Sequence, residues 1–80
     1  MHELGISRNI VAIVSGAANG RRVQKVTLEI GRASGVMPHA IRFTFDVVAQ
    51  GTLLEGAELE IRETPGDELN IKTMQLEEVT

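Results

Sequence analysis

The sequence has no cysteine, tryptophan or tyrosine, and its only aromatic residues are Phe43 and Phe45. Without thiols the chain can form no disulfide, thiolate-ligated zinc site or iron–sulfur cluster, and it has no cysteine nucleophile. Aliphatic side chains must therefore fill most of the interior. A length of 80 residues is enough for one domain and too short for two, so we expect residues 1–80 to share one small core.

Basic residues and long apolar runs are also scarce. Eight Lys and Arg against eleven Asp and Glu give a formal net charge of −3, which offers a nucleic acid no electrostatic footprint. No apolar run approaches the ~20 residues that span a bilayer, and the N-terminus has neither the basic start nor the apolar stretch of a secretory signal. We expect a cytoplasmic protein that binds neither nucleic acid nor membrane.

Two segments have the periodicity of amphipathic helices. The first covers residues 4–17, with Glu3 in its first turn, where a carboxylate meets the positive end of the helix dipole, and Asn19-Gly20 as a left-handed stop. The second runs from Pro38, which suits a first helical position, to residue 50. The expected apolar faces are Ile6, Ile10, Ile13, Val14 and Ala17 in the first helix, and Ile41, Phe45 and Val48, widened by Met37, Thr44 and Ala49, in the second.

Three segments have the alternation of strands. Residues 23–30 and 57–62 alternate between apolar and polar side chains, and a third strand begins at Leu69. The turn sequence at residues 64–67 predicts a β-hairpin between the second and third strands. The apolar phase of the third strand slips after Ile71, which predicts a β-bulge near Thr73.

The order α-β-α-β-β predicts an α/β fold, a two-layer sandwich with two helices packed on one face of a three-stranded mixed sheet. A right-handed crossover would make the first two strands parallel, and the hairpin would make the third antiparallel. The opposite face of the sheet should stay in solvent. Its polar residues are Lys25, Thr27, Glu29, Glu58, Glu60 and Arg62.

The residues that could support catalysis are few. No GxSxG motif or Gly-rich phosphate loop is present, and the serines lie near no predicted base. Paired acids such as Glu58 with Glu60 and Glu77 with Glu78 are typical of solvated surfaces. We therefore predict that the chain is not an enzyme, because an acid/base enzyme would need a pocket with convergent carboxylates that the sequence does not display.

His2 is the residue whose chemistry depends most on its position. The terminal amine of Met1, the backbone nitrogen of His2 and the His2 imidazole can reach one ion, and three nitrogens in one plane suit Ni(II) or Cu(II) better than Zn(II) or Mg(II). Glu3 has two candidate roles, as an oxygen donor to the ion or as a cap of the helix start. His39 also has two, as an additional donor or as an exposed residue in the first turn of its helix.

Several segments together resemble one protein family. The opening MHELGISRNI, the central RVQKVTLEIGRASGVMPHAIRFTFDVVAQGTLLEGAELEI and the later GDELNIKTMQLEE resemble, in order, the HypA/HybF nickel-insertion proteins that mature nickel–iron hydrogenases. The most specific matches are Met1-His2-Glu3, Leu28-Glu29-Ile30-Gly31, Phe43-x-Phe45-Asp46 and Gly51-Thr52 with Glu55-Gly56. Each match is weak alone, but together they cover nearly the whole chain.

The resemblance implies a nickel metallochaperone that binds Ni(II) transiently at Met1, His2 and Glu3, with His2 essential. It also implies two partners, the family's GTPase HypB and a hydrogenase precursor, and some members also serve urease maturation. An α/β nickel-binding domain is expected, in agreement with the periodicity. Because an unpaired edge strand or a strained turn favours exchange between copies, a homodimer is a further candidate.

The chain departs from the family at one place. Family members carry a zinc module with two pairs of cysteines between the strands that here are joined directly at about residues 64–67, and every cysteine is missing. Structural zinc is therefore not expected. A naturally reduced relative and an engineered deletion are both compatible with the short junction. A protein-interaction adaptor that no longer delivers metal is the alternative function.

Overall fold

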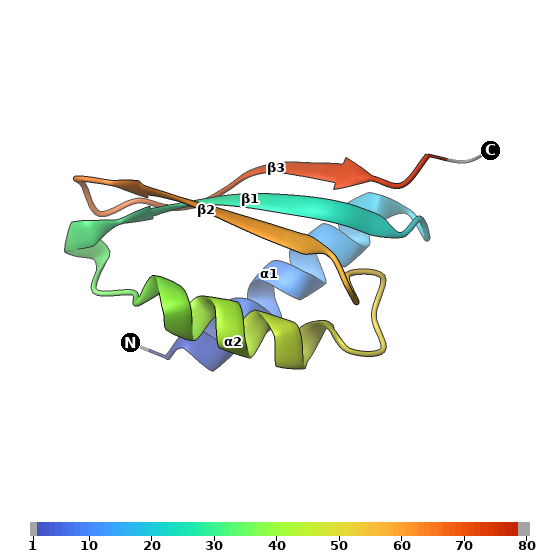
Figure 1. The fold of residues 1–80 in the computed structure, drawn as a ribbon, viewed down its shortest axis with the longest axis horizontal. Helices are drawn as coiled ribbons and strands as arrows, with labels where there is room; N and C mark the ends of the chain where they lie inside the picture. Colours follow the sequence, from blue (N-terminus) through green and yellow to red (C-terminus); the bar gives the residue numbers. More distant parts are fainter. Residues whose placement is uncertain (1, 79–80) are drawn as a thin grey trace.

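The structure of the protein is a computed structural model that describes residues 2–78 (Figure 1). Within that range, neither helix combines the length and the hydropathy needed to cross a bilayer. A single 3₁₀ turn, η1, follows the first strand. The elements are α1 (Glu3–Ala18), β1 (Val23–Gly31), η1 (Arg32–Ser34), α2 (Pro38–Ala49), β2 (Glu58–Thr64) and β3 (Leu69–Leu76).

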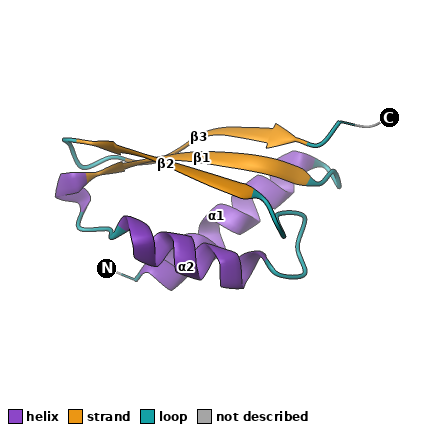
Figure 2. Ribbon diagram, viewed as in Figure 1, coloured by secondary structure: helices purple, strands orange, loops and turns teal. Residues whose placement is uncertain are grey.

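Both helices lie on one face of a three-stranded sheet whose order is β2-β1-β3 (Figure 2). β2 runs parallel to β1, with Val26 opposite Leu59, and β3 runs antiparallel to it, with Val26 opposite Met74. The predicted two-layer α/β sandwich with a mixed sheet is therefore confirmed. Each element lies within one or two residues of its expected range.

The predicted hairpin between β2 and β3 is wrong, because both strands pair with β1 and lie on opposite sides of it. The connection at residues 65–68 crosses the end of β1. There the N–H of Gly31 donates to the Glu68 carbonyl at 2.7 Å, and the N–H of Ala33 donates to the Gly66 carbonyl at 2.9 Å. A Cβ at Gly31 would collide with the backbone oxygen of Gly66. A glycine at the end of β1 therefore permits the crossing.

The predicted β-bulge near Thr73 is confirmed. Thr27 lies opposite Thr73 and Leu28 lies opposite Ile71, so Lys72 is the extra residue on β3. The bulge returns Met74 and Leu76 to the face that carries Ile71, which explains how the slipped apolar pattern still points toward the helices. These three side chains remain only partly buried against the core.

α1 begins and ends as its sequence predicts, with Glu3 in the first turn and Asn19 in the left-handed conformation at φ 52°. Its buried face is rotated from the predicted one. Ile13 is 61% exposed and Ala17 is also exposed. The helix packs against both the sheet and α2, which shifts the buried side. The buried residues are Ser7, Ile10, Val11, Val14 and Ala18.

α2 begins at Pro38, as predicted, and its core residues Ile41 and Phe45 have no exposed surface. Met37, which was expected to widen the apolar stripe, is instead the exposed residue before the helix. The hydroxyl of Thr44 meets the buried hydroxyl of Ser7 at 2.7 Å and joins the two helices. One continuous apolar cluster thus lies between the helices and the inner face of β1.

Candidate metal centre at the start of the first helix

His2 lies directly before α1 with its side chain exposed. Its carbonyl accepts the first helical hydrogen bond, from the N–H of Ile6 at 3.1 Å, while its side chain makes no capping hydrogen bond. Because the N–H groups at a helix start have no intrahelical acceptor, the backbone nitrogen of His2 is not used by the helix. Met1, which was also predicted as a ligand, lies outside the described residues.

Glu3 connects the start of α1 to the start of α2. Its carboxylate Oε2 accepts a hydrogen bond from the Met37 N–H at 3.2 Å, and its carbonyl accepts one from the Thr44 hydroxyl at 3.4 Å. The hydrogen bond from Met37, followed by one from its own backbone amide, holds the pKa of the Glu3 carboxyl below its ordinary value. The fold therefore uses Glu3 as an anchor.

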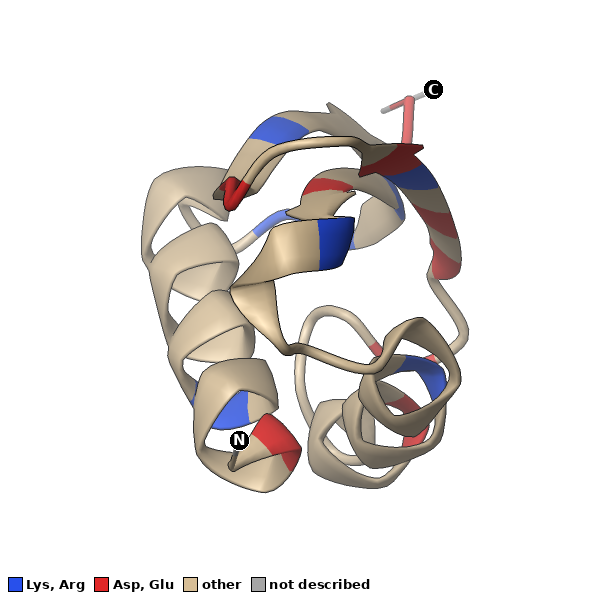
Figure 3. Ribbon diagram, turned by 90° about the vertical axis from the view of Figure 1, so that its left-hand side faces the viewer, with Lys and Arg blue, Asp and Glu red and all other residues tan. Residues whose placement is uncertain are grey.

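Two helix N-termini meet at this carboxylate, because Glu3 lies in the first turn of α1 and Met37 precedes α2. Figure 3 shows α1 and α2 side by side at the end of the molecule where the chain begins. Each N-terminus carries a partial positive charge, which would repel a bound cation. The negative charge of Glu3 offsets this repulsion next to His2.

His39 is exposed in the first turn of α2, two residues after the amide that binds Glu3. No described hydrogen bond or ion pair joins it to His2. Between residues 2 and 78, no three His, Asp or Glu side chains lie close enough together to hold a metal ion. Side chains of the described residues therefore do not build a metal centre by themselves, and the predicted site depends on Met1 and on the backbone nitrogen of His2.

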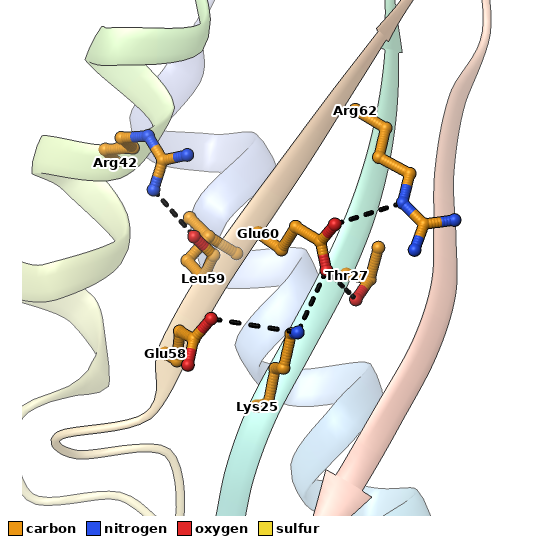
Figure 4. A network of polar contacts seen from close by, with 7 residues as sticks. All are labelled: Lys25, Thr27, Arg42, Glu58, Leu59, Glu60 and Arg62. Atoms are coloured by element: carbon orange, nitrogen blue, oxygen red, sulfur yellow. Dashed lines mark hydrogen bonds and ion pairs between the residues drawn. The ribbon is translucent and has the colours of Figure 1, made fainter.

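Charged side chains also make several contacts with one another on the outer face of the sheet (Figure 4). Lys25 Nζ lies 3.0 Å from a Glu60 carboxylate oxygen and 3.7 Å from Glu58, and Arg62 Nε lies 3.1 Å from the other Glu60 oxygen. The hydrogen bond with Glu60 raises the pKa of Lys25, and the bonds with Lys25 and Arg62 lower the pKa of Glu60. Glu60 thus stays ionised and paired, which does not suit a general acid.

Thr27 departs from the prediction that this face is wet, because it is only 3% exposed. Its hydroxyl donates to a Glu60 carboxylate oxygen at 3.4 Å, and Figure 4 shows the long side chains of Lys25, Glu60 and Arg62 around it. The other predicted residues of this face are exposed or half-buried.

Sequence reasoning missed the contribution of Met37 and Thr44 to the start of α1. Met37 contributes its backbone N–H, which no side-chain pattern reveals, and Thr44 was expected only to widen an apolar stripe. A polar residue on the apolar side of α2, opposite a serine on α1, was the available signal that the two helices pack together there.

Three comparisons relate the chain to known proteins. Residues 1–76 match the sequence model of a family described as "Hydrogenase/urease nickel incorporation, metallochaperone, hypA". The chain is 64% identical over 66 residues to a protein of Nostoc punctiforme named "Hydrogenase maturation factor HypA", covering 82% of this chain and 58% of that protein. It is 53% identical over 66 residues to the protein of the same name from Geobacter metallireducens, covering 82% and 60%.

A solved structure has the same fold. The chain superposes with a TM-score of 0.73 on "Solution structure of the Ni metallochaperone HypA from Helicobacter pylori", at 20% identity and over 80% of this chain and 58% of that one. At this identity the likeness concerns the fold alone. The chain spans 58% to 60% of the length of these curated relatives.

Proposed function

We propose that this chain, which belongs to the HypA family of hydrogenase and urease nickel-incorporation proteins, is a nickel-binding metallochaperone domain. It would assist nickel insertion during the maturation of nickel–iron hydrogenase, with urease as a second recipient. One observation carries the proposal: the family match begins at residue 1 and so includes Met1, His2 and Glu3. The named relatives are maturation factors and metallochaperones, a class distinct from catalytic enzymes.

The proposed ligands are the Met1 amine and the backbone and imidazole nitrogens of His2. The exposed imidazole and the absence of a capping bond from it support this assignment, because the ligand is not engaged in the fold. Three nitrogens in one plane match the square-planar preference of Ni(II). Glu3 acts as the residue that anchors the start of α1, directly after His2, through the hydrogen bond that its carboxylate accepts from the Met37 N–H, and its negative charge stabilises nearby positive charge.

An exposed, incompletely coordinated ion can leave quickly, as delivery requires. An ion enclosed by four fixed ligands with supporting hydrogen bonds would be released slowly. Release would follow contact with a protein partner in the cytoplasm, for which the GTPase HypB and a hydrogenase precursor are the candidates. The 80 residues contain no cysteine, so we propose that they work as a nickel-binding unit without structural zinc.

A nickel titration of the untagged chain tests the ligand assignment. Acetylating the Met1 amine removes that nitrogen as a donor and should weaken Ni(II) binding by orders of magnitude, measured by calorimetry. His39→Ala is the matched control and should bind as the wild type does. An unchanged isotherm for the acetylated chain would contradict the assignment, and loss of binding in His39→Ala would point to His39 instead.

Acidification provides a second readout. The amine and the imidazole must both give up a proton before they can bind nickel, so protons compete with the metal for these nitrogens. Binding should therefore weaken on acidification from about pH 7.5 to about pH 5.5. Equal affinity at both values would contradict a site built on these nitrogens.

The adaptor alternative differs in its dependence on His2. Because His2 is exposed and its side chain makes no capping bond, His2→Ala should leave the fold unchanged. A nickel carrier would then lose its effect on hydrogenase maturation, measured as hydrogenase activity in cells. An adaptor would keep that effect and its partner binding.

A further inference from the structure

The two edges of the sheet differ in how they are protected. β2 forms one edge, and four of its seven residues, Glu58, Glu60, Arg62 and Glu63, are charged. The Leu59 carbonyl accepts a hydrogen bond from Arg42 Nη1 at 2.6 Å, and Figure 4 shows Arg42 on the side of β2 away from β1. Charged residues and covering groups are common means of preventing an edge strand from pairing. This edge is therefore closed to another strand.

β3 forms the other edge and has little such protection. Lys72 is the only charged residue among its eight. Among residues 2–78, no side chain hydrogen-bonds to the backbone of residues 69–76. The bulge at Lys72 interrupts the edge, so the regular part available for pairing is the first half of the strand.

The backbone groups of alternate residues in this first half point outward. The N–H of Gly31 donates to the carbonyl of Glu68, and the next pair in the register is Ile30 opposite Leu69. Hydrogen-bonded and non-hydrogen-bonded pairs alternate in antiparallel ladders. The N–H and C=O groups of Leu69 and Ile71 therefore face away from β1, where another strand could bind them.

An apolar groove runs beside this part of the edge. It has a volume of about 180 Å³ and lies between α1 and β3. Two of its large apolar side chains reach solvent, Ile13 at 61% exposure and Leu69 at 39%. The remaining lining residues are Ile6, Asn9, Ile10, Leu28, Asn70 and Ile71.

We infer that the first half of β3 binds the same segment of a second copy of this chain, antiparallel, about a twofold axis at Asn70. This register sets Leu69 opposite Ile71 of the second copy, so their outward backbone groups bond to each other. It also sets Lys72 opposite Glu68 of the second copy, and the symmetry gives this opposite-charge contact twice.

The geometry of the pair also covers the groove. A twofold axis perpendicular to the sheet keeps the helices of both copies on one face. The two α1 helices then flank the new strand pair, and Ile13 of each copy meets apolar surface of the other. Because five residues of strand and one helix side chain make a small interface, the dimer forms reversibly rather than permanently.

Sedimentation equilibrium of the 80-residue chain tests this dimer. The apparent mass should rise from 8.7 kDa toward twice that value as the concentration increases from micromolar to millimolar. Ile13→Asp should stay folded, because Ile13 is exposed, and should remain monomeric at concentrations where the wild type is dimeric. The matched control is Phe43→Asp, which changes an apolar residue on α2 that is even more exposed than Ile13 and should dimerise as the wild type does.

Charge reversal tests the register. Lys72→Glu places like charges opposite each other twice and should weaken the dimer by roughly tenfold. Adding Glu68→Lys should restore it. A mass of 8.7 kDa at every concentration would overturn the inference, as would a dimer that Phe43→Asp abolishes and Ile13→Asp does not. Failure of a folded double variant to recover would overturn this register.

Discussion

Two regions of the molecule, the apolar core beneath β1 and the first turn of α1, differ in how much of the fold they require. Leu28, Ile41 and Phe45 have no exposed surface, and each belongs to a cluster that joins the helices to the sheet. His2 is exposed, and Glu3 is held by hydrogen bonds to Met37 and Thr44. The core determines whether the chain folds, while the proposed ligands belong to two consecutive residues and require little of the fold.

This difference indicates that stability and nickel binding can be changed separately. A substitution in the core should lower the free energy of unfolding without altering the donor atoms at the N-terminus. A substitution at His2 should remove a donor without disturbing packing. The predictions below test this separation.

The largest effect on stability is expected at Phe45. Phe45→Ala removes a fully buried ring and should lower the free energy of unfolding by about 3–5 kcal/mol. Phe43→Ala is the matched control, because Phe43 is 71% exposed, and it should change stability by less than about 0.5 kcal/mol. Urea denaturation followed by circular dichroism measures both. Equal losses would show that the core is placed wrongly.

A smaller effect is expected where the 65–68 connection crosses β1. Gly31→Ala places a Cβ against the Gly66 carbonyl and should cost about 1–3 kcal/mol, because the backbone must move. Gly16→Ala has open space around its Cβ within α1 and should stabilise the chain by up to about 1 kcal/mol. The same denaturation experiment compares the two. A neutral Gly31→Ala would mean that the connection does not approach β1 closely.

The smallest effect is expected at Glu3 and should depend on pH. The pKa of Glu3 is lowered in the folded chain, so its stabilising contribution is present above the ordinary value of 4.5 and is lost as the pH falls through the lowered value. Glu3→Gln should therefore melt below the wild type at neutral pH, with the difference shrinking in acid. Glu63→Gln controls for the loss of one charge. A difference that does not vary with pH would contradict the anchoring role.

Most of the fold could be predicted from periodicity, because both helices and all three strands have clear apolar patterns. The hairpin could not, since a short turn sequence usually joins neighbouring strands and only pairing with β1 determines that β3 lies on its far side. The buried face of α1 was also predicted wrongly, because packing on α2 buries Ser7 through its contact with Thr44.

The candidate site was predictable only in part. The position of His2 suggested a chelate from chemistry alone, and that remains a prediction because Met1 lies outside the described residues. The link from Glu3 to Met37 depends on a backbone amide 34 residues away, which no local pattern encodes. Sequence therefore indicates which atoms could bind nickel, and the tertiary structure indicates how the start of α1 is held.

The absorption spectrum of the untagged chain loaded with one equivalent of Ni(II) tests the central claim most directly. Coordination by the Met1 amine and the two His2 nitrogens predicts a low-spin, square-planar band that gives a yellow colour. That band should be absent in a folded His2→Ala variant. A wild-type spectrum showing only the hydrated ion, or the same band in both proteins, would contradict nickel binding at the first two residues.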